Sequence, residues 1–131
     1  MANNLVISQT NTLALSEKFD FGEMIKPLQK ELFLMETYIA GTTHIEDTSV
    51  IEDLKEGECL TLKREPGNHF DERAILVIDD QKRKIGYVPE KDNEVLSRLM
   101  DGGKMLFGKV TGIEDEEYKM HIDIGVYLED F

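Results

Sequence analysis

The chain has 131 residues, of which 40% are apolar and 32% charged, and its formal net charge is -12. This length suffices for one domain with one hydrophobic core and excludes a motor or kinase domain. The excess of acids argues against a protein that wraps duplex DNA through a generally basic surface. The single cysteine excludes an internal disulfide and a multi-cysteine zinc site.

No segment approaches the ~18 consecutive apolar residues of a membrane-spanning helix, and the longest apolar run is Ala74–Ile78. Residues 1–7 lack the basic start and the long apolar stretch of a secretory signal. We therefore expect a cytoplasmic protein without a membrane partner. The sequence leaves its oligomeric state open.

Residues 1–30 are predicted to form a partly helical N-terminal appendage, because apolar residues at loosely helical spacing are interrupted by Gly22 and Pro27. Residues 31–131 are predicted to form the main domain, which begins with a strand ending at Gly41. The further predicted elements are a helical turn at 50–54, strands at 58–64, 73–79 and 84–88, a helix capped by Asn93 and ended by Gly102, and a last hairpin over 105–128 with an acidic turn at 114–117.

These elements amount to six short strands and two short helices with no long crossover connection. They predict a mainly β (α+β) fold, a small six-stranded antiparallel β-barrel of the OB-like or SH3-like kind, which buries one core and leaves few exposed edges. A βαβ sandwich is the weaker alternative.

Little in the sequence favours an enzyme. The three histidines, His44, His69 and His121, are scattered, and there is no glycine-rich phosphate loop or nucleophile elbow. Cys59 lies in a predicted strand, where a lone cysteine is more typical of a small core residue than of a nucleophile. We expect no catalytic residue, no metal site and no cofactor.

The most informative segment runs from Lys63 to Ile75. Pro66, Gly67 and Asn68 predict a sharp reversal between two strands, in which the asparagine bonds the backbone of its own loop. The same loop collects basic, imidazole, aromatic and carboxylate side chains. Residues 63–91 hold seven Lys/Arg against six acids, a net charge of +1, so the rest of the chain carries -13. Residues 63–91 are therefore a candidate anion-contacting face, although solvated strand ends and turns would give the same charge pattern.

Two motifs in this region, Arg-Glu-Pro-x-Asn-x-Phe-Asp at 64–71 and Ile-Gly-Tyr-Val-Pro at 85–89, resemble the HIRAN domain. The similarity spans roughly residues 32–128. It implies an OB-like β-barrel with helices. The family is known from DNA translocases of replication-fork repair and from small bacterial and phage proteins. The resemblance therefore implies capture of a single-stranded DNA 3′ end, in DNA repair or replication-fork processing, together with DNA-processing proteins as possible partners.

The resemblance also implies site residues. The aromatic–Asp pair that stacks a terminal base and meets the 3′ hydroxyl falls on Phe70 and Asp71, and the turn asparagine falls on Asn68. Tyr87 takes a position where translocase members have a histidine near the phosphate.

The family's Arg–aromatic pair after the first strand falls near Thr43 and His44, where this sequence departs from the pattern. His44 is a candidate DNA-binding residue because of this position, and Arg64 and Lys84 complete the candidates because Lys and Arg contact phosphates. Two other interpretations stay open. One is a protein-interaction barrel that has lost the DNA site, and the weaker one is an acidic DNA mimic.

Overall fold

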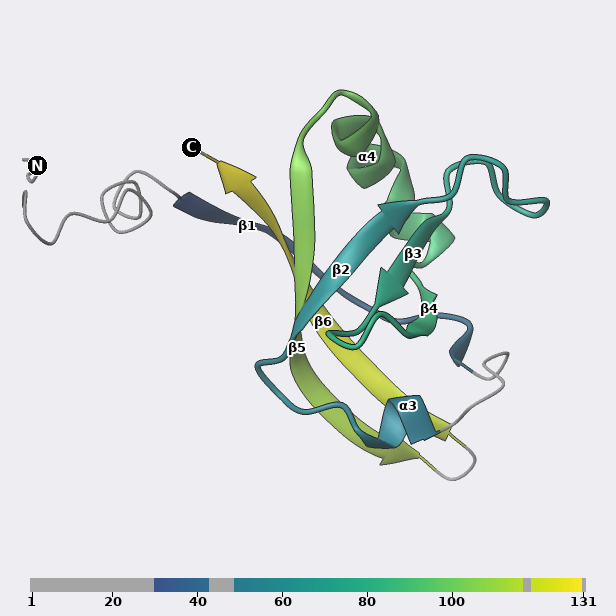
Figure 1. Cartoon of the computed structure of the whole chain (residues 1–131), viewed down its shortest axis with the longest axis vertical. Helices are drawn as coiled ribbons and strands as arrows, with labels where there is room; N and C mark the ends of the chain where they lie inside the picture. The colour runs from purple at the N-terminus through teal and green to yellow at the C-terminus, as the bar shows by residue number, and fades with distance from the viewer. Residues whose placement is uncertain (1–29, 43–48, 117–118, 131) are drawn as a thin grey trace, which may run out of the picture. The chain divides into compact units, whose positions relative to one another are not determined.

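The computed structural model describes residues 30–42, 49–116 and 119–130. In these residues the strands form one six-stranded sheet in the order β1-β6-β5-β2-β3-β4 (Figure 1). The strands are β1 (Lys30–Tyr38), β2 (Cys59–Arg64), β3 (Ile75–Ile78), β4 (Lys84–Tyr87), β5 (Met105–Glu116) and β6 (Lys119–Asp130), and the helices are α3 (Ser49–Glu52) and α4 (Glu90–Asp101). The predicted mainly β, antiparallel fold is confirmed.

The core follows from the alternation of side chains along the strands. In β2, Leu60 and Leu62 are buried, whereas Cys59, Thr61 and Lys63 face outward. The inward residues of the other strands meet them in a single cluster, to which α4 contributes Leu96. Cys59 is thus an exposed residue of the outer face and not the small core residue that its strand position suggested.

The two ends of the strand order meet just after β1. The Ala40 amide donates to the Tyr87 carbonyl (2.7 Å), and the Tyr87 amide donates to the Ala40 carbonyl (2.9 Å). This isolated bridge joins the chain that follows β1 to β4, the opposite edge of the sheet. The sheet therefore curves into a barrel-like shape that is held at its seam by one bridge and not closed by a full ladder.

Helix α4 begins earlier than the sequence predicted. Its N-cap is Pro89, with φ -60° and ψ 146°, and Asn93 lies inside the helix with 0% exposure. Proline suits this boundary because its φ is fixed near the helical value, and Glu90 and Asp92 in the first turn favour the positive end of the helix. The prediction that Asn93 caps α4 is wrong, whereas Gly102 ends the helix as predicted.

The remaining boundaries differ by a few residues. A turn joins β3 to β4, in which buried Asp79 accepts the backbone amides of Gln81 (3.0 Å) and Arg83 (2.7 Å) through one carboxylate oxygen. Strand β5 continues to Glu116, so most of the predicted acidic turn belongs to a strand.

Residues 1–29 lie outside the described residues, and the division into 1–30 and 31–131 stays a prediction. Among the described residues, no helix is long and apolar enough to cross a membrane.

Gly86 is the residue that allows the seam to form. A Cβ there would meet the Ala40 carbonyl oxygen and lie 2.7 Å from Ile39 Cγ2. We expect Gly86→Ala to lower the free energy of unfolding by about 1–3 kcal/mol, the usual cost of overpacking. Urea denaturation measures this. Gly67→Ala is the matched control, because a Cβ at Gly67 meets nothing within 4 Å, and an equal loss in both variants would contradict the role of the seam.

Candidate nucleic-acid interface

The loop between β2 and β3 is the candidate site. It continues the hairpin, since the Glu65 amide donates to the Ala74 carbonyl (3.0 Å). The Asn68 amide then donates to the Glu65 carbonyl (3.1 Å), which closes the reversal that Pro66 and Gly67 begin. The chain after Asn68 is therefore presented beyond the end of the sheet.

The side chain of Asn68 organises this loop. Its Oδ1 accepts the backbone amides of Phe70 (2.8 Å) and Asp71 (3.1 Å), and its Nδ2 donates to Glu65 Oε1 (3.1 Å). Asparagine suits this position because its short amide bonds the backbone a few residues ahead. The backbone directions of Phe70 and Asp71 are thus set by one side chain.

Phe70 projects into solvent with 95% of its surface exposed, the largest value among the exposed large apolar residues of the described chain. An exposed phenyl ring gains nothing from the core, and its face is available to a flat partner. Nucleobases stack on such rings, typically for about 1–3 kcal/mol per base.

Asp71 is half-buried beside Phe70 and is held from two sides. Its Oδ1 accepts the backbone amide of Arg73 (2.9 Å), and its Oδ2 accepts Asn93 Nδ2 from α4 (2.7 Å). Burial raises the pKa of this carboxyl, but these two hydrogen bonds and the nearby arginines outweigh burial and hold the pKa below its usual value of 3.8. A carboxylate has about four acceptor positions, so Asp71 keeps acceptor capacity for a ligand hydroxyl.

Tyr87 supports the loop from β4. Its hydroxyl donates to Glu65 Oε1 (2.8 Å), the same oxygen that Asn68 Nδ2 contacts. The hydrogen bonds from Asn68 and Tyr87 lower the pKa of Glu65 below 4.5, and burial together with Glu65 raises the pKa of Tyr87. The hydroxyl proton of Tyr87 is therefore used inside the protein, and its role in this geometry is to fix Glu65.

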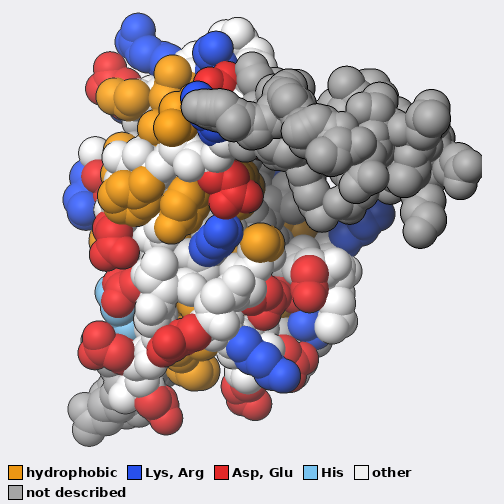
Figure 2. Space-filling model, turned by 90° about the vertical axis from the view of Figure 1, so that its left-hand side faces the viewer, with side chains coloured by type: hydrophobic (Ala, Val, Ile, Leu, Met, Phe, Trp, Pro, Cys, Tyr) orange, Lys and Arg blue, Asp and Glu red, His pale blue; other side chains and the backbone are white. Residues whose placement is uncertain are grey.

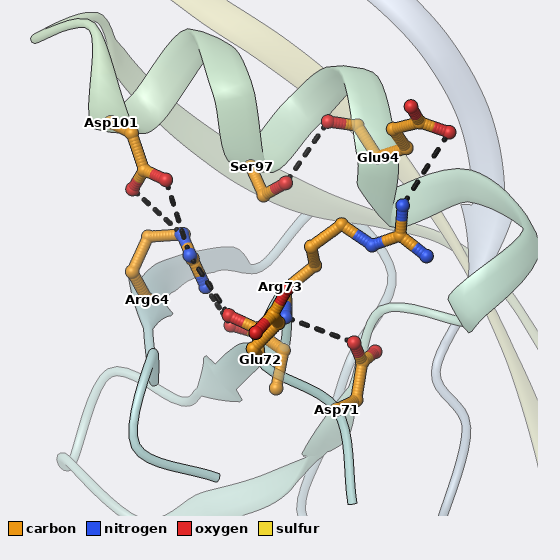
Figure 3. A network of polar contacts seen from close by, with 8 residues as sticks. Arg64, Asp71, Glu72, Arg73, Glu94, Ser97 and Asp101 are labelled. Atoms are coloured by element: carbon orange, nitrogen blue, oxygen red, sulfur yellow. Dashed lines mark hydrogen bonds and ion pairs between the residues drawn. The ribbon is translucent and has the colours of Figure 1, made fainter.

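The cations of the hairpin divide into two groups. Arg64 is largely buried and uses its guanidinium internally: Nε donates to Asp101 Oδ1 (2.8 Å), and the terminal nitrogens reach the carbonyls of Ala74 (2.7 Å) and Glu72 (3.1 Å) (Figure 3). Lys63 and Lys84 are exposed, and both charges lower the pKa of Glu65. Both lysines thus remain accessible near the loop, whereas Arg73, which is also exposed, pairs with Glu94 at 3.6 Å.

The structure brings together Asn68, Phe70, Asp71 and Tyr87 through Glu65, with Lys84 nearby. His44 lies outside the described residues. Sequence reasoning did not predict Glu65 as a site residue, and it assigned Asn93 a capping role instead of a contact with the site. The signal for Asn93 is its spacing, since a polar residue three positions before the buried Leu96 lies on the inward side of the helix and needs a partner there.

Within the described ranges, no group of three His, Cys, Asp or Glu residues could hold a metal ion. The fold and the loop define a small barrel-like β-module whose candidate site lies on one hairpin. The HIRAN domain family matches residues 32–129, and the chain belongs to this family.

Three known proteins are similar to this chain. It is 34% identical over 80 residues, 60% of its length, to a Fanconi-associated nuclease 1 homolog from Arabidopsis thaliana, of which it spans only 8%. A crystal structure of a Lactobacillus plantarum protein matches with a TM-score of 0.73 and 28% identity, covering 79% of this chain and 99% of the other. The crystal structure of the HIRAN domain of human HLTF matches with a TM-score of 0.61 and 16% identity, covering 76% and 78%. At 16% identity the last likeness shows the fold alone.

The first prediction from the site concerns Asn68. Asn68→Ala removes the acceptor of two backbone amides, so we expect amide hydrogen exchange at Phe70 and Asp71 to accelerate and the free energy of unfolding to fall by about 1–2 kcal/mol. Exchange measured by NMR and urea denaturation test both effects. His69→Ala, in the exposed neighbour, is the control. Unchanged exchange at both amides in Asn68→Ala would refute the organising role of this side chain.

A second prediction concerns Tyr87 and pH. A carboxyl whose folded-state pKa is lowered stabilises the fold above its ordinary pKa and loses that contribution as the pH falls through the folded value. Tyr87→Phe removes one of the two hydrogen bonds that lower the pKa of Glu65. We expect it to lower the free energy of unfolding at pH 7 by about 0.5–1.5 kcal/mol. The difference from wild type should narrow below pH 4.5 in urea denaturation, and a difference that grows toward acid would contradict the contact.

Proposed function

We propose that this protein is a non-enzymatic DNA-binding module that captures the 3′ end of single-stranded DNA. The observation that carries the proposal is the pairing of an exposed ring, Phe70, with an anchored carboxylate, Asp71, on one loop that Asn68 holds in shape. Membership of the HIRAN family supports it.

Each group has a role that suits its chemistry. The face of Phe70 stacks the terminal base, and Asp71 accepts a hydrogen bond from the 3′ hydroxyl. Asn68 positions both residues. Lys63 and Lys84 are better placed than Arg64 to meet the backbone phosphates, because the guanidinium of Arg64 is already paired with Asp101. Tyr87 acts through Glu65, and His44 stays a candidate from the sequence.

The wider setting is part of the same proposal. The chain is similar to a short part of a relative that is named as a nuclease. This similarity supports a role together with DNA-processing proteins, in DNA repair or replication-fork processing. A binding module of this kind needs no cofactor. The cytoplasmic location expected from the sequence belongs to the proposal as well.

A protein-interaction role is the second candidate, and a different surface favours it. On the outer face, Phe33 packs edge-on against Tyr127, which stacks on Phe107, and Lys109 lies 5.0 Å from the Tyr127 ring centre. Phe33 is 55% exposed and Met105 61%. Figure 2 views the side on which β1 and β5 lie and shows apolar side chains gathered there among charged ones.

The end chemistry gives the direct test. A terminal 3′ phosphate would lie against the Asp71 carboxylate, and two like charges a few ångströms apart repel. We expect a short labelled strand with a free 3′ hydroxyl to bind more tightly than the same strand with a 3′ phosphate in fluorescence anisotropy. The strand with a 5′ phosphate is the control. Equal affinity for the two 3′ ends would count against end capture.

The stacking role of Phe70 is tested separately. Because the ring is exposed, Phe70→Ala should weaken binding of the 3′-hydroxyl strand by about 1–3 kcal/mol while leaving the melting temperature close to that of wild type. Phe33→Ala, which removes another exposed ring, is the matched control and should leave DNA affinity unchanged. The reverse result, loss in Phe33→Ala only, would move the binding surface to the outer face.

A further inference from the structure

Helix α4 presents a row of polar side chains to the hairpin that carries the candidate site. Asn93, Glu94 and Asp101 each engage one charged residue of that hairpin. Asn93 Nδ2 donates to Asp71 Oδ2 (2.7 Å), Glu94 Oε1 lies 3.6 Å from a terminal nitrogen of Arg73, and Asp101 pairs with Arg64 at 2.8 Å. Figure 3 shows the two arginines turned toward the carboxylates of the helix.

These contacts pair both arginines of the hairpin with carboxylates of α4 and leave Asp71 without a cation partner. Arg73 is only two residues from Asp71 and its charge lowers the pKa of that carboxyl, yet its guanidinium pairs with Glu94 instead. Arg64 likewise pairs with Asp101. In the described part of the chain, Asp71 forms no ion pair within 4 Å, and its two recorded partners are neutral N–H donors. Its negative charge is anchored but not neutralised by a direct cation.

The orientation of the Asn93 amide follows from the same contact. Nδ2 must face Asp71, since the opposite orientation would place two acceptor oxygens against each other. The Oδ1 atom is then buried without a hydrogen-bond partner among the described residues. An unsatisfied buried carbonyl is unfavourable, so an asparagine is poorly suited to this position if it only fills space. The hydrogen bond from Nδ2 to Asp71 explains why an asparagine stands here.

We propose that Asn93 and Glu94 are specificity-determining positioning residues: Asn93 anchors the Asp71 carboxylate with a neutral donor, and Glu94 keeps Arg73 away from it. Asp71 then accepts a ligand hydroxyl and repels a ligand phosphate. This inference rests on the proposed function. It adds that residues of α4 set the choice between a 3′ hydroxyl and a 3′ phosphate.

The test measures the ratio of affinities for 3′-hydroxyl and 3′-phosphate strands by fluorescence anisotropy, using the full chain. In Glu94→Gln, Arg73 is released toward Asp71, and we expect the ratio to fall about two- to fivefold, as an exposed charge pair allows. In Asn93→Leu the anchor is lost, and we expect a fall of about tenfold. Glu90→Gln removes the same charge from the exposed first turn of α4 and should leave the ratio unchanged.

The outcomes separate the two proposals. A role of α4 in folding alone would lower the affinity for both ends equally and leave the ratio at its wild-type value in both variants, which would overturn the inference. A wild-type ratio of one would instead overturn the proposed function, and the inference with it.

An NMR titration of the Asp71 carboxyl without DNA tests the charge sorting independently. We expect its pKa to rise in Asn93→Leu and to fall in Glu94→Gln, where an anion is removed and Arg73 is freed. Glu94 is exposed, so we expect the Glu94→Gln variant to fold. A rise or no change of the Asp71 pKa in Glu94→Gln would overturn the inference even if Asn93→Leu proved unstable.

Discussion

The amide side chain of Asn68 is the contact on which the geometry of the site depends. It satisfies two backbone amides that a tight reversal would otherwise leave to solvent, and it reaches back to Glu65 with its remaining donor. Glu65 in turn is held by Tyr87, whose backbone forms the isolated bridge to Ala40 at the seam of the sheet. The exposed ring of Phe70 is therefore connected to the seam of the barrel through a short series of hydrogen bonds. A flexible loop would lose much of its binding energy to ordering, whereas this loop is ordered beforehand.

The net charge of the protein also limits how it can bind DNA. A protein with a net charge of -12 cannot hold DNA by a general basic surface. Even in the near-neutral region 63–91, three arginines pair with acids: Arg64 with Asp101, Arg73 with Glu94, and Arg83 with Asp79 and Asp53. Accessible lysines near the loop are few. Binding that depends on stacking and one hydroxyl contact fits such a surface, because neither interaction needs many neutralised phosphates. The same scarcity of accessible cations supports the proposal that the protein binds a strand end and not a long strand.

Much of the fold follows from local sequence. The sequence predicted a strand at 58–64, where β2 lies, and the breaker at Gly102 predicted the end of α4. The hydrogen bonding of Asn68 to its own loop could likewise be predicted, since an asparagine side chain at a reversal commonly bonds the backbone a few residues ahead. These features depend on neighbours within a few residues, where spacing alone carries the information.

Other features depend on contacts that local spacing does not reveal. Asn93 and Asp71 are 22 residues apart, and Arg64 and Asp101 are 37 apart. Their pairing exists only once α4 has docked against the hairpin. Asn93 was misread as a cap for this reason: an asparagine early in a helix usually serves the backbone, and only the docked helix shows a side-chain partner. The seam between Ala40 and Tyr87 was hidden in the same way, because the curvature of the whole sheet brings its two edges together.

The most direct measurement is an amide NMR titration of the full chain with a short single strand that ends in a free 3′ hydroxyl. The account predicts that the largest shifts fall on residues 68–73, with smaller ones at Tyr87 and Asn93, and that they shrink when the same strand carries a 3′ phosphate. Shifts centred on the outer face around Phe33, Phe107 and Tyr127, or no shifts with any strand end, would contradict it.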